Sequence, residues 1–405
     1  MKKELYYDTV IAGCGVGGLF TALHLPENQK ILMISKEDLE SCNSMLAQGG
    51  ICVLLGDWDY DDYFEDTMRA GHYENRKESV DIMLRSSRHV INQLIDFGVD
   101  FARNSDGTLA YTREGAHSRP RICFHEDTTG KEITTKLQRV VKNMPNIEIM
   151  EYTEMKDIII ENGVCCGIYA ETKNGDKLKI YAKDTVMATG GIGGTYKHST
   201  NFRCLTGDAL EISKKHGIQL DHLDYVQIHP TVLFSEKPGR RFLISESARG
   251  EGAILLNSKG ERFVNELLPR DVVANAIFKE MEKEGTKHVW LSFENIKDEE
   301  IKSHFPNIMN TCMEAGYDIT KEPIPVVPAQ HYFMGGVHVN SDSETTMKHL
   351  YAVGETSCNG VHGRNRLASN SLLESMVFGE KAAEHIIKTR KEKMDECDHD
   401  AACSR

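Results

Sequence analysis

The chain has 405 residues, of which 40% are hydrophobic, and its formal net charge is −13. This length exceeds one ordinary core, so we expect two or three domains or one large domain with an insertion. The acidic balance excludes a general nucleic-acid or anionic-membrane binder, because both need a surplus of Lys and Arg. A local cluster of cations could still bind an anionic small substrate.

The first part of the chain predicts a βαβ unit. A buried strand, a glycine turn, a helix and a second parallel strand are expected at residues 8–12, 13–18, 19–25 and 30–35. Pro26 ends the helix, because proline cannot donate the backbone hydrogen bond that continuation requires. This order is the opening of a doubly wound parallel sheet.

The middle of the chain predicts further helices and strands. Residues 60–97 are polar and helix-biased. Residues 164–181 predict a β-hairpin or small meander, with the turn at Asn174-Gly175. Residues 185–194 predict another buried strand that ends in glycines. Residues 350–355 predict a parallel strand and glycine turn, and a helix is expected from about residue 369.

The cysteines and the N-terminus indicate the compartment. The 11 cysteines include the adjacent Cys165 and Cys166, and no C-x-x-C spacing occurs. Zinc ribbons and thioredoxin-like redox pairs therefore have no support, and we expect no bound metal. We see no signal-peptide pattern and no segment near the ~20 apolar residues of a spanning helix. We expect a cytoplasmic protein whose cysteines are mostly small buried side chains.

The turn at residues 13–18 has the spacing G-x-G-x-x-G, which is typical of dinucleotide binding. Glycines permit a tight turn and close backbone approach to a pyrophosphate, which then faces a helix N-terminus. In NAD-binding proteins an acidic residue is expected at the end of the second strand. Ser35 and Lys36 occupy that place, which weakens the interpretation as an NAD site.

Five later segments favour FAD. They are AQGG at 47–50, ATGG at 188–191, TGD at 206–208, GE at 354–355 and SNSLLE at 369–374. With these motifs the sequence resembles the flavoprotein family that contains succinate dehydrogenase, fumarate reductase and L-aspartate oxidase. The resemblance extends from about residue 8 to about residue 387.

The resemblance implies a fold and its boundaries. We expect an α/β protein with a Rossmann-like FAD-binding domain, made of a doubly wound parallel sheet and a small β-meander, and an inserted α+β capping domain. The FAD-binding domain would comprise residues 1–221 and 334–387, and the capping domain residues 222–333. Residues 388–405 are charged and are expected to form a frayed polar tail.

The resemblance also implies which residues bind FAD. The pyrophosphate is expected at Gly13, Cys14, Gly15, Val16, Gly17 and Gly18. The ribityl and isoalloxazine region is expected at Lys36, Asn43, Ser44, Met45, Leu46, Ala47, Gln48, Gly49 and Gly50. Asp208 is expected near the FAD, Glu355 on a ribose hydroxyl, and Ser371 and Leu372 at a helix N-terminus that faces the pyrimidine edge of the flavin.

Two positions distinguish members of the family. Membrane-bound succinate dehydrogenases and fumarate reductases bond FAD covalently through a histidine at the position of Asn43. Asparagine cannot form that bond, so we expect non-covalent FAD. The segment at residues 112–118 (TREGAHS) resembles the aspartate-oxidising members, in which Glu114 orients the α-amino group. Without an amine, a buried carboxylate beside a dianion would cost several kcal/mol, roughly.

The resemblance assigns the substrate pocket to cationic and hydrogen-bonding side chains, which suit a dicarboxylate. Arg366 and His331 would bind one substrate carboxylate. His229 and Ser245 would bind the other. Aspartate oxidases usually carry threonine at the Ser245 position, and serine keeps the hydroxyl.

Arg270 matches the proton-donating arginine of fumarate reduction. Guanidinium is effectively always protonated, so a proton relay is needed, for which Glu246 and Arg249 are the candidates. For aspartate oxidation, Arg270 could instead act by orientation and charge, and both roles stay open. The histidines outside these motifs are expected to be structural; they are His117, His125 and His338.

The implied function is FAD-dependent oxidation of L-aspartate to iminoaspartate, with hydride transfer from the substrate Cα to flavin N5. The imine would pass to quinolinate synthase in NAD biosynthesis, and oxygen, fumarate or a quinone would reoxidise the flavin.

Two alternatives are a soluble fumarate reductase or succinate oxidase with non-covalent FAD, and an electron-transferring subunit on a membrane-anchored iron–sulfur partner. A non-catalytic flavin binder would have lost a pocket residue, and none is lost. Longer aspartate oxidases carry a C-terminal helical domain, so we expect a short form.

Overall fold

A computed structural model describes residues 3–403, with side chains described as far as residue 392. Its largest sheet has five parallel strands: β1 (Lys3–Ala12), β2 (Ile31–Ile34), β5 (Ile147–Met150), β8 (Lys177–Met187) and β15 (Leu350–Ala352). Two antiparallel strands, β6 (Thr153–Glu161) and β7 (Val164–Thr172), extend the sheet beyond β8. The predicted α/β fold class, with its parallel sheet and meander, is confirmed.

Strand β8 spans parts of two predicted segments, residues 164–181 and residues 185–194. Its N-terminal half pairs with β7 from Gly167 opposite Tyr181 to Glu171 opposite Lys177. Its C-terminal half pairs with β15, while β1 pairs along almost the whole length. One continuous strand therefore belongs to both the meander and the parallel sheet.

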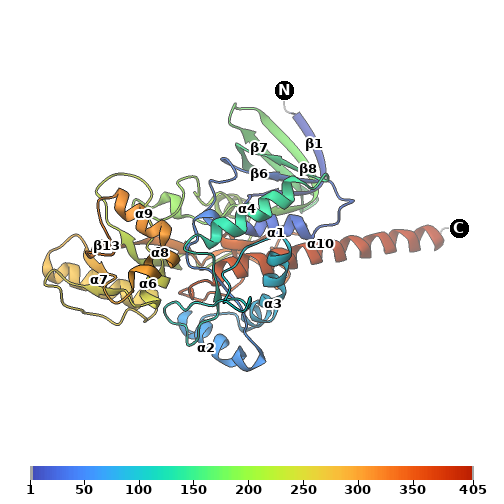
Figure 1. The fold of residues 1–405 in the computed structure, drawn as a ribbon. Helices are drawn as coiled ribbons and strands as arrows, with labels where there is room; N and C mark the ends of the chain where they lie inside the picture. The colour runs from blue at the N-terminus through green and yellow to red at the C-terminus, as the bar shows by residue number, and fades with distance from the viewer. Residues whose placement is uncertain (1–2, 404–405) are drawn as a thin grey trace.

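The parallel sheet is buried on both faces at β2, at β15 and at the C-terminal ends of β1 and β8, which explains why these stretches are mostly apolar. In β1, Ile11 packs into one core, and its neighbours Val10 and Ala12 pack into the other. The first core contains the helices α1 (Val16–His24), α3 (Lys77–Asp96), α4 (Thr129–Lys142) and α10 (Asn370–Cys403). The second contains α5 (Asp208–Lys215) and the meander. Figure 1 shows α1, α4 and α10 beside the sheet.

A second, separate sheet is antiparallel and has the order β10-β13-β12-β11. Its strands are β10 (Val226–Leu233), β11 (Ile254–Leu256), β12 (Val289–Ser292) and β13 (Ile324–Phe333). The helices α6 (Glu246–Gly250), α7 (Arg270–Glu284), α8 (Asp298–His304) and α9 (Pro306–Glu314) lie with it (Figure 1). This unit has its own apolar core. We call it the cap; the exact domain boundaries stay a prediction.

The remaining elements are short. They are α2 (Tyr60–Ala70), the strand pair β3 (Ile51–Cys52) and β4 (Ile122–Cys123), the three-stranded sheet of β9 (Leu220–Asp221), β14 (Gly336–His338) and β16 (Ser357–Cys358), and the 3-10 helices η1 (Asn43–Leu46), η2 (Asp57–Asp59), η3 (Gly193–Thr195) and η4 (Gly354–Thr356). None of the helices within residues 3–403 combines the length and the apolar character needed to cross a bilayer.

The C-terminal residues differ from the expectation. A frayed tail was expected at residues 388–405, but α10 continues to Cys403 and projects from the body of the protein (Figure 1). The helix starts in the core, and each further residue then adds one hydrogen bond to an existing helix. The stretch after Lys388 contains no Gly or Pro and is rich in good helix formers.

Candidate active site

A cavity of about 420 Å³ lies where the FAD-binding unit meets the cap. Its volume is within the range of ~300–1,000 Å³ that is usual for ligand and cofactor sites. The structure brings all the predicted site residues to its walls: residues 13–18, Lys36, residues 43–50, Asp208, Glu355, Ser371 and Leu372 from the cofactor set, and Glu114, His229, Ser245, Glu246, Arg270, His331 and Arg366 from the catalytic set.

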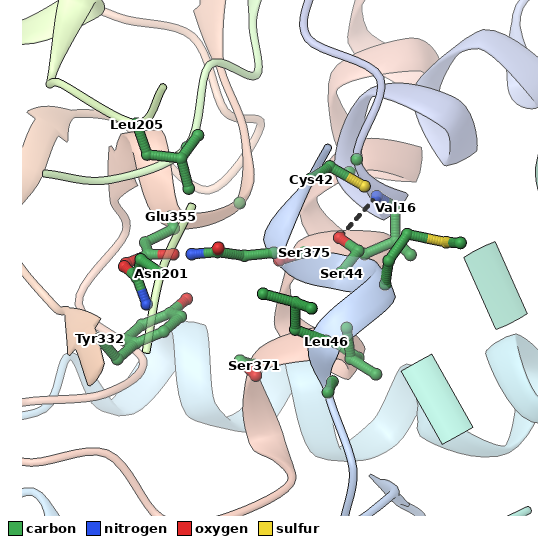
Figure 2. Close-up of a pocket in the computed structure, with 18 of the residues that line it drawn as sticks. Val16, Cys42, Ser44, Leu46, Asn201, Leu205, Tyr332, Glu355, Ser371 and Ser375 are labelled. Carbon is green, nitrogen blue, oxygen red and sulfur yellow. Dashed lines mark hydrogen bonds between the residues drawn. The ribbon is translucent and has the colours of Figure 1, made fainter. Parts of the chain in front are cut away.

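The glycine turn presents backbone rather than side chains to this cavity. Gly13 has φ +120°, and a Cβ there would lie 2.0 Å from the carbonyl oxygen of Ala188. Gly15 is the N-cap of α1 and has no side chain with which to cap the helix. The amide of Val16 donates to Ser44 Oγ at 3.1 Å (Figure 2). The N-terminus of α1 lines the cavity, so its positive end can face a pyrophosphate, with Ser44 bonded to the first amide.

Lys36 follows β2 and closes one part of the rim. Its Nζ donates to Asp208 Oδ2 at 2.9 Å and to Thr206 Oγ1 at 2.9 Å. Glu154 lies 3.3 Å away. These contacts connect the end of β2 with the start of α5, where the resemblance implied that Lys36 lies at the ribityl and isoalloxazine region and that Asp208 lies near the FAD.

Asn43 and Glu355 lie at the cavity wall that the sequence assigned to FAD. Asn43 Oδ1 accepts a hydrogen bond from the amide of Phe202 at 3.2 Å. Glu355 Oε1 accepts from the amide of Phe333 at 3.0 Å, and burial raises the pKa of Glu355 to about 7. Figure 2 shows Glu355 on the wall opposite Ser44. A buried acid at this place can accept a hydrogen bond from a ribose hydroxyl.

These groups fit FAD. The glycine turn leaves room for a pyrophosphate, and the N-terminus of α10 brings Ser371 and Leu372 to the same cavity. Asn43 has no ring nitrogen that could bond to a flavin. The cavity therefore fits FAD, and the chemistry of Asn43 excludes a covalent bond to a flavin at that position.

His229 presents a hydrogen-bond donor to the cavity. Its Nδ1 accepts from the amide of Thr231 at 3.2 Å, so the proton of the neutral ring is on Nε2. Within the described residues this buried Nε2 has no partner. Burial, with the cations Arg270 and Arg249 and the neighbouring His331, holds the pKa of His229 well below its usual range. A neutral imidazole here can donate to a carboxylate oxygen.

His331 lies next to His229 in the cavity wall, with ring centroids 5.1 Å apart. Its Nδ1 is 2.7 Å from Thr200 Oγ1, which orients the ring. Burial, followed by Arg270 and Arg366, also lowers the pKa of His331 far below its usual range. The cavity therefore contains two neutral histidines rather than two cations.

Arg270, Glu246 and Arg249 form a buried chain of charges. Arg270 Nε donates to Glu246 Oε2 at 2.5 Å, and a nitrogen of Arg249 lies 3.5 Å from the same oxygen. Although burial acts to raise it, the two guanidinium groups lower the pKa of Glu246. Ser245 caps α6 directly before Glu246, and its Oγ accepts from the amide of Ser247 at 3.2 Å.

Arg366 approaches the same space from the FAD-binding unit. Its guanidinium donates to Ser371 Oγ at 2.6 Å and lies 4.3 Å from the centre of the Tyr332 ring. Burial, followed by repulsion from Arg270, lowers the pKa of Arg366 to about 10. At neutral pH the group is therefore still a cation and can bind a carboxylate.

Glu114 is 2% exposed and lies against the flavin-binding loop. A Cβ at Gly49 would be 2.0 Å from Glu114 Oε1, so the absence of a side chain at Gly49 makes room for the carboxylate. Its other oxygen, Oε2, accepts from Ser369 Oγ at 2.5 Å. Burial and the nearby Glu246 raise the pKa of Glu114.

Three supporting residues were not assigned roles from the sequence. Gln227 Oε1 accepts from Arg270 at 2.8 Å and from Arg366 at 3.3 Å. Thr200 orients His331, and Ser369 contacts Glu114. Ser369 stands inside the quoted SNSLLE motif, and Gln227 stands two residues before His229. No sequence signal singled out Thr200, because its contact depends on how the loop at residues 199–200 packs on β13.

The three histidines expected to be structural do not line the cavity. His117 Nε2 is 3.0 Å from the carbonyl of Ala368, and its Nδ1 is 3.2 Å from Arg121. His125 Nδ1 is 2.5 Å from the carbonyl of Asp100. His338 Nδ1 is 2.5 Å from Asp221. Each therefore has a structural partner.

A glycine turn on a doubly wound sheet, an uncapped helix N-terminus and a cation-lined cavity define an FAD-binding flavoprotein. The sequence model of the FAD binding domain family matches residues 8–372. L-aspartate oxidase of Clostridium perfringens is 50% identical over 380 residues, which cover 94% of this chain and 86% of that protein. L-aspartate oxidase of Nostoc sp. is 42% identical, with coverages of 93% and 67%.

Solved structures agree with this assignment. A mutant quinol fumarate reductase of E. coli superposes with a TM-score of 0.89 at 32% identity, covering 95% of this chain and 70% of that chain. A Mycobacterium smegmatis Sdh1 complex superposes with a TM-score of 0.79 at 30% identity, covering 95% and 69%. The chain belongs to the L-aspartate oxidase family of FAD-binding flavoproteins.

Proposed function

We propose that this chain oxidises L-aspartate to iminoaspartate. The observation that carries the proposal is the position of Glu114, a buried carboxylate in the same cavity as Arg270 and Arg366. A dicarboxylate alone would leave Glu114 without a positive partner. The ammonium group of aspartate supplies that partner, so the cavity matches an amino dicarboxylate better than succinate.

The substrate carboxylates are held by two sets of donors. Arg366 and His331 bind one carboxylate, with the arginine supplying the charge. His229 Nε2 and Ser245 Oγ bind the other. The free Nε2 of His229 supports this role, because a buried donor without a partner is costly until a ligand oxygen accepts from it.

FAD, when bound, supplies the acceptor at N5 for the hydride that leaves the substrate Cα. The residues of this chain orient the substrate and handle its proton. Glu114 accepts a hydrogen bond from the amine and can take its proton, since the pKa of Glu114 is raised. Arg270 and Glu246 place positive and negative charge at fixed points, and Arg249 extends this chain away from the cavity.

The chemistry of the product suggests the pathway to which the reaction belongs. Iminoaspartate is a reactive imine, so the reaction would be the first step of NAD biosynthesis through quinolinate, with delivery to quinolinate synthase. Oxygen or fumarate would reoxidise the flavin, and fumarate fits the same carboxylate-binding groups. We place the reaction in the cytoplasm, consistent with the nine cysteines that the structure describes, all of which are free thiols.

Anaerobic reduction of the purified yellow protein tests the proposal. L-aspartate should bleach the flavin absorbance, and succinate at the same concentration should not. Bleaching by succinate alone would replace the proposal with the second candidate, a soluble succinate oxidase or fumarate reductase. That candidate is favoured by the two arginines in the cavity, which suit any dicarboxylate, and by the 32% identity to a quinol fumarate reductase. Bleaching by neither compound would reject both substrates.

A further inference from the structure

The contact between Ser369 and Glu114 joins two segments that lie 255 residues apart in the chain. Ser369 is 7% exposed, and its Oγ donates to Glu114 Oε2 at 2.5 Å. The other oxygen of Glu114 lies beside Gly49 in the cavity. One carboxylate oxygen is thus occupied by a protein hydroxyl, and the other is left for a ligand.

Ser369 adopts a backbone conformation that is unfavourable for serine. Its φ is +61°, in the left-handed region that favours glycine. Such a conformation is costly and persists only where the surroundings impose it. The residue stands directly before α10, so this conformation sets the direction in which its hydroxyl points.

The surroundings impose that conformation from both sides. The carbonyl of Ser369 accepts from the amide of Cys52 at 3.1 Å, and the carbonyl of Ala368 lies 3.0 Å from His117 Nε2. On the other side, the buried Asn370 accepts from Tyr63 at 2.7 Å. The chain on each side of Ser369 is therefore held by buried hydrogen bonds.

His117 and Glu114 belong to the same loop, so this loop contacts residues 368–369 twice. Behind the loop, the completely buried Arg121 donates to His117 at 3.2 Å, to Asp66 at 2.7 Å and to Asp59 at 2.9 Å. A buried ionic network thus supports the loop that carries Glu114. The distance between Ser369 and Glu114 is fixed independently of any ligand.

From this geometry we propose that Ser369 is a positioning residue for the substrate amine. Its hydroxyl holds Glu114 in the orientation that leaves Oε1 facing the amine, and it thereby sets the preference for an amino dicarboxylate over an amine-free one. The inference rests on the proposed function and names the Ser369 hydroxyl as the group that sets the substrate preference. Ser369 acts through Glu114.

The test compares Ser369→Ala and Ser369→Gly with the wild-type holoenzyme, in L-aspartate oxidation and in fumarate reduction by the reduced flavin. A hydrogen bond to a charged group contributes enough that we expect kcat/KM for aspartate to fall about 10- to 100-fold, with a clearly smaller loss on fumarate. The Ser369→Gly variant relieves the strained φ but also lacks the hydroxyl. Its kcat/KM for aspartate should therefore fall as far as that of Ser369→Ala.

Two further measurements distinguish a positioning role of Ser369 from a purely structural role. In a Glu114→Ala background, Ser369→Ala should change kcat/KM for aspartate by less than about twofold, because both changes remove one interaction. Loss of the hydroxyl should also raise the pKa of Glu114 and shift the acid limb of the kcat/KM profile for aspartate to higher pH.

Ser343 provides a matched control. It is fully buried, has φ +61° and donates its hydroxyl to the carbonyl of Phe378 at 2.8 Å, but it does not line the cavity. Ser343→Ala should leave the ratio of the two activities at the wild-type value.

Equal losses on aspartate and fumarate, wild-type activity in Ser369→Gly, or additive effects with Glu114→Ala would each overturn the inference. A wild-type protein that does not respond to aspartate would instead reject the proposed function, so the two failures are distinguishable.

Discussion

Glu114 and Glu246 are two buried carboxylates of one cavity whose pKa values move in opposite directions. The Cβ position of Gly115 lies 2.4 Å from Glu246 Oε1, so the loop carrying Glu114 packs directly on Glu246. Burial and the charge of Glu246 raise the pKa of Glu114. Two arginines override burial at Glu246 and lower its pKa. Such separation is typical of a site in which one carboxylate exchanges a proton and the other stays charged.

Replacing Glu114 by Gln should impair aspartate oxidation selectively. The amide keeps the shape but loses the charge that attracts the ammonium group, so kcat/KM for aspartate should fall about 10- to 100-fold. Fumarate reduction should not fall, because a negative charge near a dianion has been removed. Steady-state kinetics with both substrates measure this. An equal loss on both would mean that Glu114 does not recognise the amine.

Arg270→Lys should lower kcat strongly while FAD content stays normal. Lysine cannot reproduce both the 2.5 Å contact to Glu246 and the 2.8 Å contact to Gln227. Removal of a fixed donor from a reacting centre typically costs about 10²- to 10³-fold in kcat. Arg262→Lys serves as the control, because Arg262 is exposed and pairs with the buried Glu266 outside the cavity. Comparable activity of the two variants would exclude Arg270 from the reaction.

Gly13→Ala should abolish FAD binding or folding. The added Cβ would meet the carbonyl of Ala188 at 2.0 Å and would also require φ +120°. Gly107→Ala is the matched control, since Gly107 has φ +85° but nothing within 4 Å of the added Cβ. Flavin content and fluorescence titration with FAD separate a steric effect from backbone strain. Similar behaviour of both variants would refute the steric explanation.

His117 should make the protein less stable in acid. Burial and then Arg121 lower its pKa to about 4, from about 6.5 in the unfolded chain. The unfolded chain therefore binds the extra proton first. The stability contribution is complete above pH ~6.5 and is lost as the pH falls towards 4, by an order-of-magnitude total of about 3 kcal/mol.

His117→Gln removes this titration and can keep both hydrogen bonds. Urea unfolding of the FAD-saturated proteins at pH 7 and pH 4 measures the difference. The wild type should lose about 3 kcal/mol more than the variant on acidification. Parallel pH dependence in the two proteins would show that His117 titrates normally.

Local motifs made much of this protein predictable. The glycine turn at 13–18 requires a strand before it and a helix after it, and the structure has β1 and α1 there. Asn174-Gly175 predicted a turn, which lies between β7 and β8. The tail was predicted incorrectly, because a lack of apolar residues does not prevent a helix from continuing once the core has nucleated it.

The sequence by itself determined the cofactor, through the types and spacing of residues 13–18 and 47–50, and the non-covalent attachment, through Asn43. It also supplied every candidate side chain of the substrate pocket. Only the tertiary structure decided how these side chains act. The pKa of Glu114, the free Nε2 of His229 and the orienting contact of Ser369 depend on burial and on neighbours that are distant in sequence. Electrostatics and hydrogen bonding act over a few ångströms in space, and those distances exist only after the chain has folded.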